Sequence, residues 1–71
     1  MSLFKRHPAM SHAVMVNLYS GNAIQGVLTQ TVGNYLVIKS AIVHEPGLEP
    51  APADGAIVLD AANVDFIQVT N

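Results

Sequence analysis

The residues with the clearest chemical potential are an amide beside an aromatic ring and a small basic cluster. Asn34 and Tyr35 are adjacent and follow Gly33, and Lys5 and Arg6 are adjacent in the first part of the chain. An exposed ring can stack on a nucleic-acid base, an amide can hydrogen-bond to it, and cations neutralise phosphates. The alternative, which is the more common role of such residues, is that Tyr35 packs at a strand edge, Asn34 makes a turn and the cations are solvated.

The histidines and carboxylates form no recognisable metal or catalytic motif. His7 and His12 are five residues apart, and nothing in the sequence brings His44 near them, whereas zinc or iron needs two or three such ligands. We interpret Asp60 and Asp65 as charges at strand ends rather than as an acid–base pair. No serine lies in a nucleophile elbow, and no glycine-rich phosphate loop opens a helix. We expect no metal, no cofactor and no enzymatic activity.

The composition of this chain bounds its size and class. Its 71 residues suffice for one small domain, residues 1–71, and the chain has no cysteine that could form a disulfide bond. Only 11% of the residues are charged and 51% are hydrophobic, against roughly 25% charged residues in a typical soluble domain. A lone domain of this size is marginally stable. We therefore expect an oligomer, and, because no apolar run reaches membrane-spanning length, a soluble cytoplasmic protein without a membrane partner.

The charges are divided between the two parts of the chain. All three lysines and arginines lie in residues 1–44, and all five acidic residues lie in residues 45–71. Such asymmetry is one sign of an anionic partner. The alternative is a chance distribution in a chain with few charges.

Alternation of apolar and polar residues predicts an all-β fold. We expect strands over about residues 14–19, 23–32, 35–43, 56–60 and 63–69. Val64 and Phe66 are predicted on one face of the last strand and Ile67 and Val69 on the other, so both faces are apolar. A strand of this kind calls for cover from another subunit.

The segments outside the strands are predicted to be less regular. Residues 1–12 form an N-terminal segment that allows a short helix, although Pro8 restricts it. Residues 44–55 contain prolines and glycines that interrupt a hydrogen-bonded ladder, and they are predicted to be a loop without a strand. Residues 13–43 thus carry three strands and residues 56–69 carry two.

Two series of residues resemble the motifs of a known superfamily. The first reads Val14-x-Val16-x-Leu18-x-x-Gly21-x-x-x-x-Gly26-x-Leu28, and the second combines Ile57-Val58-Leu59, Asp60-Ala61, Asn63-Val64 and Phe66-Ile67. Over about residues 14–69 they resemble the Sm/LSm superfamily, whose bacterial branch is the Hfq-type RNA chaperone. The resemblance implies a small five-stranded, strongly bent antiparallel barrel with a short N-terminal helix, in a divergent prokaryotic or phage-type member. Gly26, inside a strand, is the expected position of the bend.

The resemblance also indicates where this chain departs from members that bind uridine-rich RNA. It implies that the turn at Asn34 and Tyr35 contributes a stacking ring and an amide, and that an arginine stacks from the opposite side. Asp60-Ala61 stands at the Arg-Gly position, and a carboxylate repels phosphates. We therefore expect a degraded uridine pocket.

Two functions from different classes fit these observations. The first is a homo-oligomeric ring of about five to seven subunits that binds single-stranded RNA, with Lys5 and Arg6 on a basic face that the ring repeats. The second is a structural or protein-interaction ring that does not bind nucleic acid, which the acidic Asp60 favours.

Overall fold

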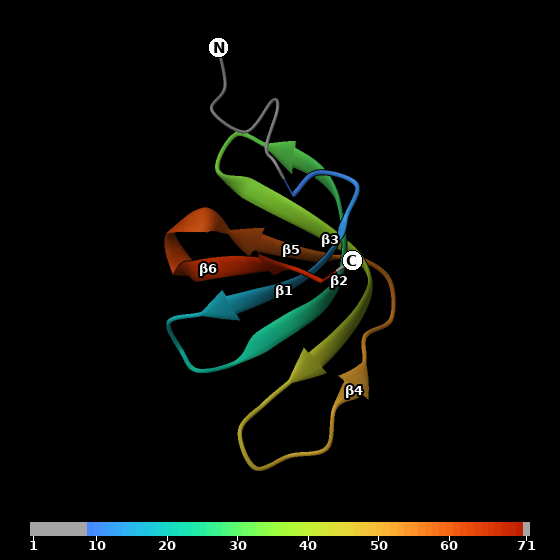
Figure 1. The fold of residues 1–71 in the computed structure, drawn as a ribbon, viewed down its shortest axis with the longest axis vertical. Coiled ribbons are helices and arrows are strands. Elements are labelled where there is room, and N and C mark those ends of the chain that lie inside the picture. The colour runs from blue at the N-terminus through green and yellow to red at the C-terminus, as the bar shows by residue number, and fades with distance from the viewer. Residues whose placement is uncertain (1–8, 71) are drawn as a thin grey trace.

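The computed structural model describes residues 9–70 of the chain, and within them the fold is almost entirely β-structure (Figure 1). The elements are β1 (Ala13–Leu18), β2 (Ala23–Val32), β3 (Tyr35–His44), β4 (Ala51–Pro52), β5 (Ile57–Asp60), the 3₁₀ turn η1 (Ala61–Asn63) and β6 (Val64–Val69). The predicted N-terminal helix falls largely on residues outside the described range. Its described part is a turn in which the His12 N–H donates to the Ala9 carbonyl at 3.1 Å.

The strands form one antiparallel sheet in the order β4-β3-β2-β1-β6. The long strand β3 bonds to β5 through its first half, Tyr35–Ile38, and to β4 through Ile42 and Val43. The sheet curls strongly (Figure 1), and β5 and β6, which no ladder joins, are connected by the three residues of η1. The prediction of a bent antiparallel all-β fold is confirmed, with six strands instead of five.

The additional strand, β4, corrects the prediction that residues 44–55 contain no strand. Ala51 pairs with Val43, and Pro52 pairs with Ile42. Proline is tolerated there because β4 lies at the edge of the sheet, where an N–H is not needed on the outer side. The segment between β3 and β4 thereby becomes a hairpin that projects from the lower end of the molecule in Figure 1.

The sheet bends where β2 crosses β3 at Gly26. A Cβ atom at this position would lie 2.6 Å from Ile38 Cγ2 and 2.7 Å from the Lys39 carbonyl oxygen. The register shifts at the same place, since Gln25 faces Ile42 while Val27 faces Lys39. The absence of a side chain at Gly26 therefore allows the two strands to approach, as the sequence predicts.

The core lies inside the curl and is built by the predicted alternation. Val14 and Val16 of β1 are fully buried, and Leu18 packs against the same cluster. Ile24 and Leu28 of β2 are buried as well. The remaining buried residues are Ala9, Leu36, Ile38 and Ala41.

A β-bulge in β6 corrects the predicted orientation of the last strand. Phe66 pairs with Asn17 but Val64 pairs with Leu18, so Asp65 is an extra residue in the ladder. One extra residue reverses the alternation. Val64 and Ile67 consequently both pack against the core, whereas Phe66 is 52% exposed.

Candidate nucleic-acid interface

Three predicted site residues come together around η1. Tyr35, the first residue of β3, is the register partner of Asp60, the last residue of β5. The N–H of Ala61 donates a 2.7 Å hydrogen bond to the carbonyl oxygen of Asn34 in the preceding turn. The β2–β3 turn and the β5–β6 connection are therefore held side by side, and Asn34, Tyr35 and Asp60 share one end of the molecule.

Tyr35 and Asn34 are accessible at this end. The Tyr35 side chain is 50% exposed, and Asn34 is exposed. The backbone carbonyl of Asn34 is used by Ala61, but within residues 9–70 no hydrogen bond engages its side-chain amide. A half-exposed ring beside an amide that is open to solvent is suited to stack on a base and to hydrogen-bond with it.

Asp60 has a structural role that the sequence did not indicate. Its carboxylate accepts a 2.9 Å hydrogen bond from the Ala62 N–H and caps η1.

Lys39 is the only lysine or arginine in the described range, and it lies four residues beyond Tyr35 along β3, about 13 Å at the usual rise of a strand. The described part of this end therefore carries negative charge.

Lys5 and Arg6, predicted to form a basic face, lie outside the described residues. Their role remains a prediction.

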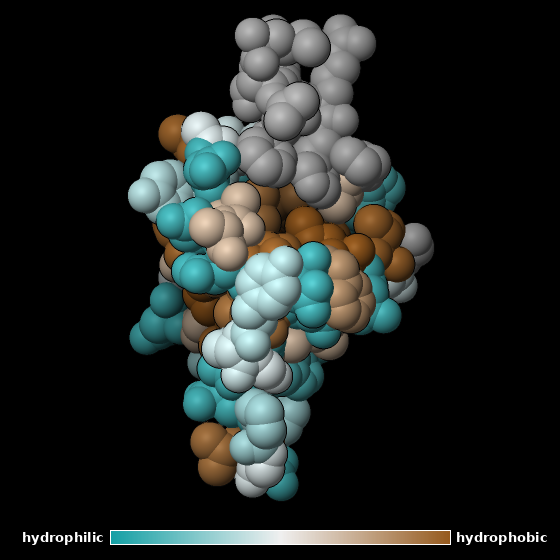
Figure 2. Space-filling model, turned by 90° about the vertical axis from the view of Figure 1, so that its left-hand side faces the viewer, coloured by the Kyte–Doolittle hydropathy of each residue, from teal (hydrophilic) through white to brown (hydrophobic). Residues whose placement is uncertain are grey.

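An exposed tyrosine that the sequence analysis did not select lies at the other end of η1. The Tyr19 N–H donates to the Asn63 carbonyl at 3.0 Å, and the Tyr19 side chain is 70% exposed. Figure 2 looks onto this side of the molecule and shows hydrophobic surface among pale and hydrophilic residues. The signal in the sequence was the aromatic residue directly before the Ser20-Gly21 turn, where no core position is available.

Besides the two-residue edge strand β4, the strands β5 and β6 each keep a free edge in the described range. β5 pairs only with β3, and β6 pairs only with β1. Apolar side chains accompany these edges, with Val58 61%, Phe66 52% and Val69 48% exposed. Free edges with apolar side chains are the usual sites of pairing with another chain.

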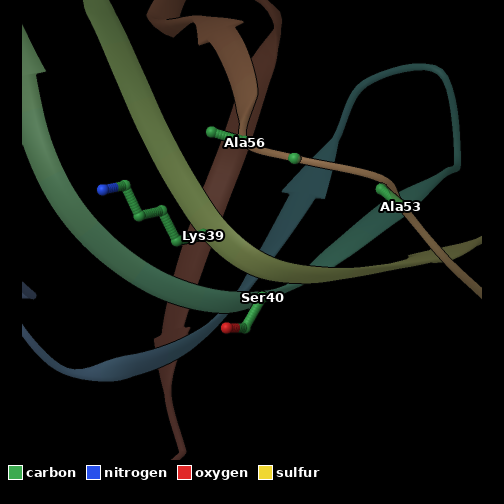
Figure 3. Close-up of a pocket in the computed structure, with 5 residues that line it drawn as sticks. Lys39, Ser40, Ala53 and Ala56 are labelled. Carbon is green, nitrogen blue, oxygen red and sulfur yellow. The ribbon is translucent and has the colours of Figure 1, made fainter.

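A shallow hollow between β3 and residues 53–56 does not have the properties of a binding site. It is lined by Lys39, Ser40, Ala53, Gly55 and Ala56. Figure 3 shows that the Lys39 ammonium group and the Ser40 hydroxyl diverge instead of pointing to a common centre. No ligand chemistry is therefore assigned to it.

Histidine and carboxylate side chains are the remaining candidate ligands in the described range. His44 Nε2 lies 2.9 Å from Gln25 Oε1, and residues 9–70 contain no group of three or more histidine, cysteine, aspartate or glutamate side chains placed to hold a metal ion. In the same range, no helix is long and apolar enough to cross a membrane.

Comparison with known proteins identifies the fold. No family profile and no curated protein matches the chain. Among solved structures, a heptameric archaeal Sm protein superposes with a TM-score of 0.75 at 23% identity, covering 90% of this chain and 93% of that one. The chain has the Sm fold. The P. aerophilum SmAP1 heptamer gives the same TM-score and identity, covering 90% of this chain and 85% of its own.

The comparison concerns the fold of the chain. Both solved structures named above are of heptamers. The two-residue strand β4, which extends the hairpin after β3, adds a sixth strand to the five that the resemblance implied. At 23% identity the comparison establishes the fold, and function must be argued from this chain's own residues.

Proposed function

We propose that this protein assembles into a closed homo-oligomeric ring that binds single-stranded RNA weakly. The observation that carries the proposal is the pair of free, apolar strand edges on β5 and β6 of one subunit. A subunit with two different free edges makes head-to-tail contacts, and such contacts close into a ring when the rotation between subunits permits it.

Ring closure would also explain why so small a chain has so few charged residues. Pairing β5 of one subunit with β6 of the next removes both edges from water and covers Val58 and Phe66. We expect about five to seven subunits, a range that includes the heptamers with the same fold. Burial of these side chains supplies stabilisation that a 71-residue monomer lacks.

RNA binding is supported by the turn at Asn34 and Tyr35 and by the basic cluster at Lys5 and Arg6. A ring repeats each of these features once per subunit, so individually weak contacts act together. Since Asp60 stands where the resemblance implies a stacking arginine, the binding is expected to be weak, salt-sensitive and poorly selective between bases.

Fluorescence anisotropy with uridine-rich and adenosine-rich oligonucleotides tests this function. Binding should weaken with rising salt, with a slope of roughly 0.7 per neutralised phosphate. The double variant with Lys5→Glu and Arg6→Glu should abolish it. Lys39→Glu, a charge reversal on the exposed part of β3 away from η1, is the control and should leave most of the affinity. Undiminished binding by the double variant would refute the basic-face arrangement.

A second candidate function, a non-catalytic protein-interaction ring, is favoured by one specific observation. Asp60 faces Tyr35 in the β3–β5 ladder, and Lys39, four residues further along β3, is the only lysine or arginine of the described range. If the ring forms but neither oligonucleotide binds even at low salt, this second function is the better account.

A further inference from the structure

We propose that Tyr19 is a second base-stacking residue, placed by η1 on the same end of the subunit as Asn34 and Tyr35. This inference rests on the proposed RNA-binding function and adds to it a residue outside the β2–β3 turn and the β5–β6 connection. It predicts that each subunit engages more than one base.

The backbone of η1 fixes the relative position of the two tyrosines. At one end, Asp60 faces Tyr35 in the β3–β5 ladder. At the other end, the Asn63 carbonyl accepts the hydrogen bond from the Tyr19 N–H at 3.0 Å. A 3₁₀ turn advances about 2 Å per residue, and facing Cα atoms in a sheet lie about 5 Å apart. The two tyrosine Cα atoms are therefore within about 16 Å of each other, a span that a few nucleotides of a single strand can cover.

The residues between the tyrosines leave the surface open. Ala61 and Ala62 contribute only methyl groups, and the exposed Asn63 adds an amide whose side chain has no hydrogen bond within residues 9–70. No large side chain of η1 separates Tyr19 from Tyr35. Single-stranded RNA can thus pass from the Tyr19 side chain to the Tyr35 side chain across the surface of η1, where the Asn63 amide can hydrogen-bond to a base.

The exposure of Tyr19 is itself unusual. It is 70% exposed, the highest value among the large hydrophobic residues of the described range, although tyrosine rings normally bury much of their area. A tyrosine has only two side-chain torsions, so it loses little conformational entropy when it is covered. A rigid, uncovered ring on an anchored turn is the arrangement that base stacking requires.

The charges around η1 determine what Tyr19 can contribute. Asp60 and Asp65 flank the turn, so phosphates gain no attraction here. Tyr19 should therefore add affinity through stacking alone, without changing the number of phosphates that are neutralised. This separates it from Lys5 and Arg6, which should set the salt dependence.

The experiment measures oligonucleotide affinity and its salt slope for the full chain, with the assembly state checked by light scattering. Tyr19→Ala should lower the affinity at least about fivefold, the lower end of the contribution of one stacked base, while the salt slope stays unchanged. Tyr19→Phe should bind as the parent does. Leu48→Ala, which removes a side chain of similar exposure (64%) from the β3–β4 hairpin, is the control and should have no effect.

Three results would overturn the inference. Tyr19→Ala could bind like the parent, which would leave the proposed function intact. Tyr19→Ala could break up the oligomer, which would show that a neighbouring subunit covers the Tyr19 side chain. Tyr19→Phe could be as weak as Tyr19→Ala, which would assign the effect to the hydroxyl. Absence of binding by the parent itself would instead refute the proposed function, and the inference with it.

Discussion

A methyl group added to Gly26 would lie 2.7 Å from the carbonyl oxygen of Lys39. Backbone atoms on two crossing strands cannot yield easily to such a contact, because β2 and β3 are held by hydrogen bonds on both sides of the register shift. The curl of the whole sheet, and with it the placement of β5 against β3, therefore depends on the absence of a side chain at this position.

Substitutions at Gly26 should destabilise the protein in proportion to the size of the new side chain. Gly26→Ala should lower the free energy of unfolding by about 2 kcal/mol, and Gly26→Val by more, since crowding at a tightly packed site costs about 1–3 kcal/mol or above. Thermal unfolding at fixed protein concentration measures this. Ala51→Val adds comparable volume on the exposed strand β4 and should change stability by less than about 0.5 kcal/mol. Equal melting of the two valine variants would contradict the role of Gly26.

Asp60 should stabilise η1 through its cap. Asp60→Ala removes the acceptor of the Ala62 N–H and should cost about 1 kcal/mol, or about 4–8 °C in melting temperature for a domain of this size. Asp60→Asn keeps a side-chain oxygen and should melt close to the parent. The capping interpretation is wrong if alanine and asparagine have the same effect.

A change of charge at Asp60 should also alter RNA binding. Asp60→Arg places a cation and a planar group beside Tyr35, so affinity should rise and a preference for uridine-rich over adenosine-rich strands should emerge. The same variant loses the cap and should be less stable than the parent. Anisotropy at fixed salt checks the first effect. Weaker binding by a correctly assembled Asp60→Arg ring would contradict the site assignment.

Much of the fold follows from local pattern in the sequence. Val14, Val16 and Leu18 alternate, and all three face the core. The second strand was predicted over the residues that β2 occupies, Ala23–Val32, because turn residues at Gly21 and Gly33 bound it on both sides. Gly26 was identifiable as the bend because an interior glycine has few other roles in a strand.

The features that the sequence did not reveal depend on pairing between distant segments. Pro52 argued against a strand, yet β4 lies at an edge where proline is compatible with the ladder. Asp65 enters β6 as a bulge only because Val64 and Phe66 pair with consecutive residues of β1. Tyr19 was not selected because its anchor, the carbonyl of Asn63, is remote in the sequence.

The free edges give a test that separates assembly from folding. Val58 is 61% exposed on β5, so Val58→Asp should be tolerated by the subunit but should oppose pairing with another chain. We expect a folded species of lower mass by size-exclusion chromatography with light scattering. Leu48→Asp, at 64% exposure on the β3–β4 hairpin, should leave the assembly unchanged. The same elution for both variants would show that β5 is not an interface.

A charge on the core side of β6 should act differently. Ile67 packs against the buried cluster, so Ile67→Asp should yield unfolded or aggregated chain instead of a smaller folded species. Gln68→Asp on the neighbouring exposed position is the control and should fold. Circular dichroism distinguishes the two outcomes, and a well-folded Ile67→Asp variant would contradict the orientation that the bulge produces.

Native mass spectrometry of the parent chain tests the central claim most directly. The account predicts one dominant species of about five to seven times the 7.5 kDa chain mass at micromolar concentration. It also predicts that this species persists when the protein is diluted within the micromolar range, because each subunit is held by both its β5 edge and its β6 edge. A stable, folded monomer of 7.5 kDa under the same conditions would contradict the ring.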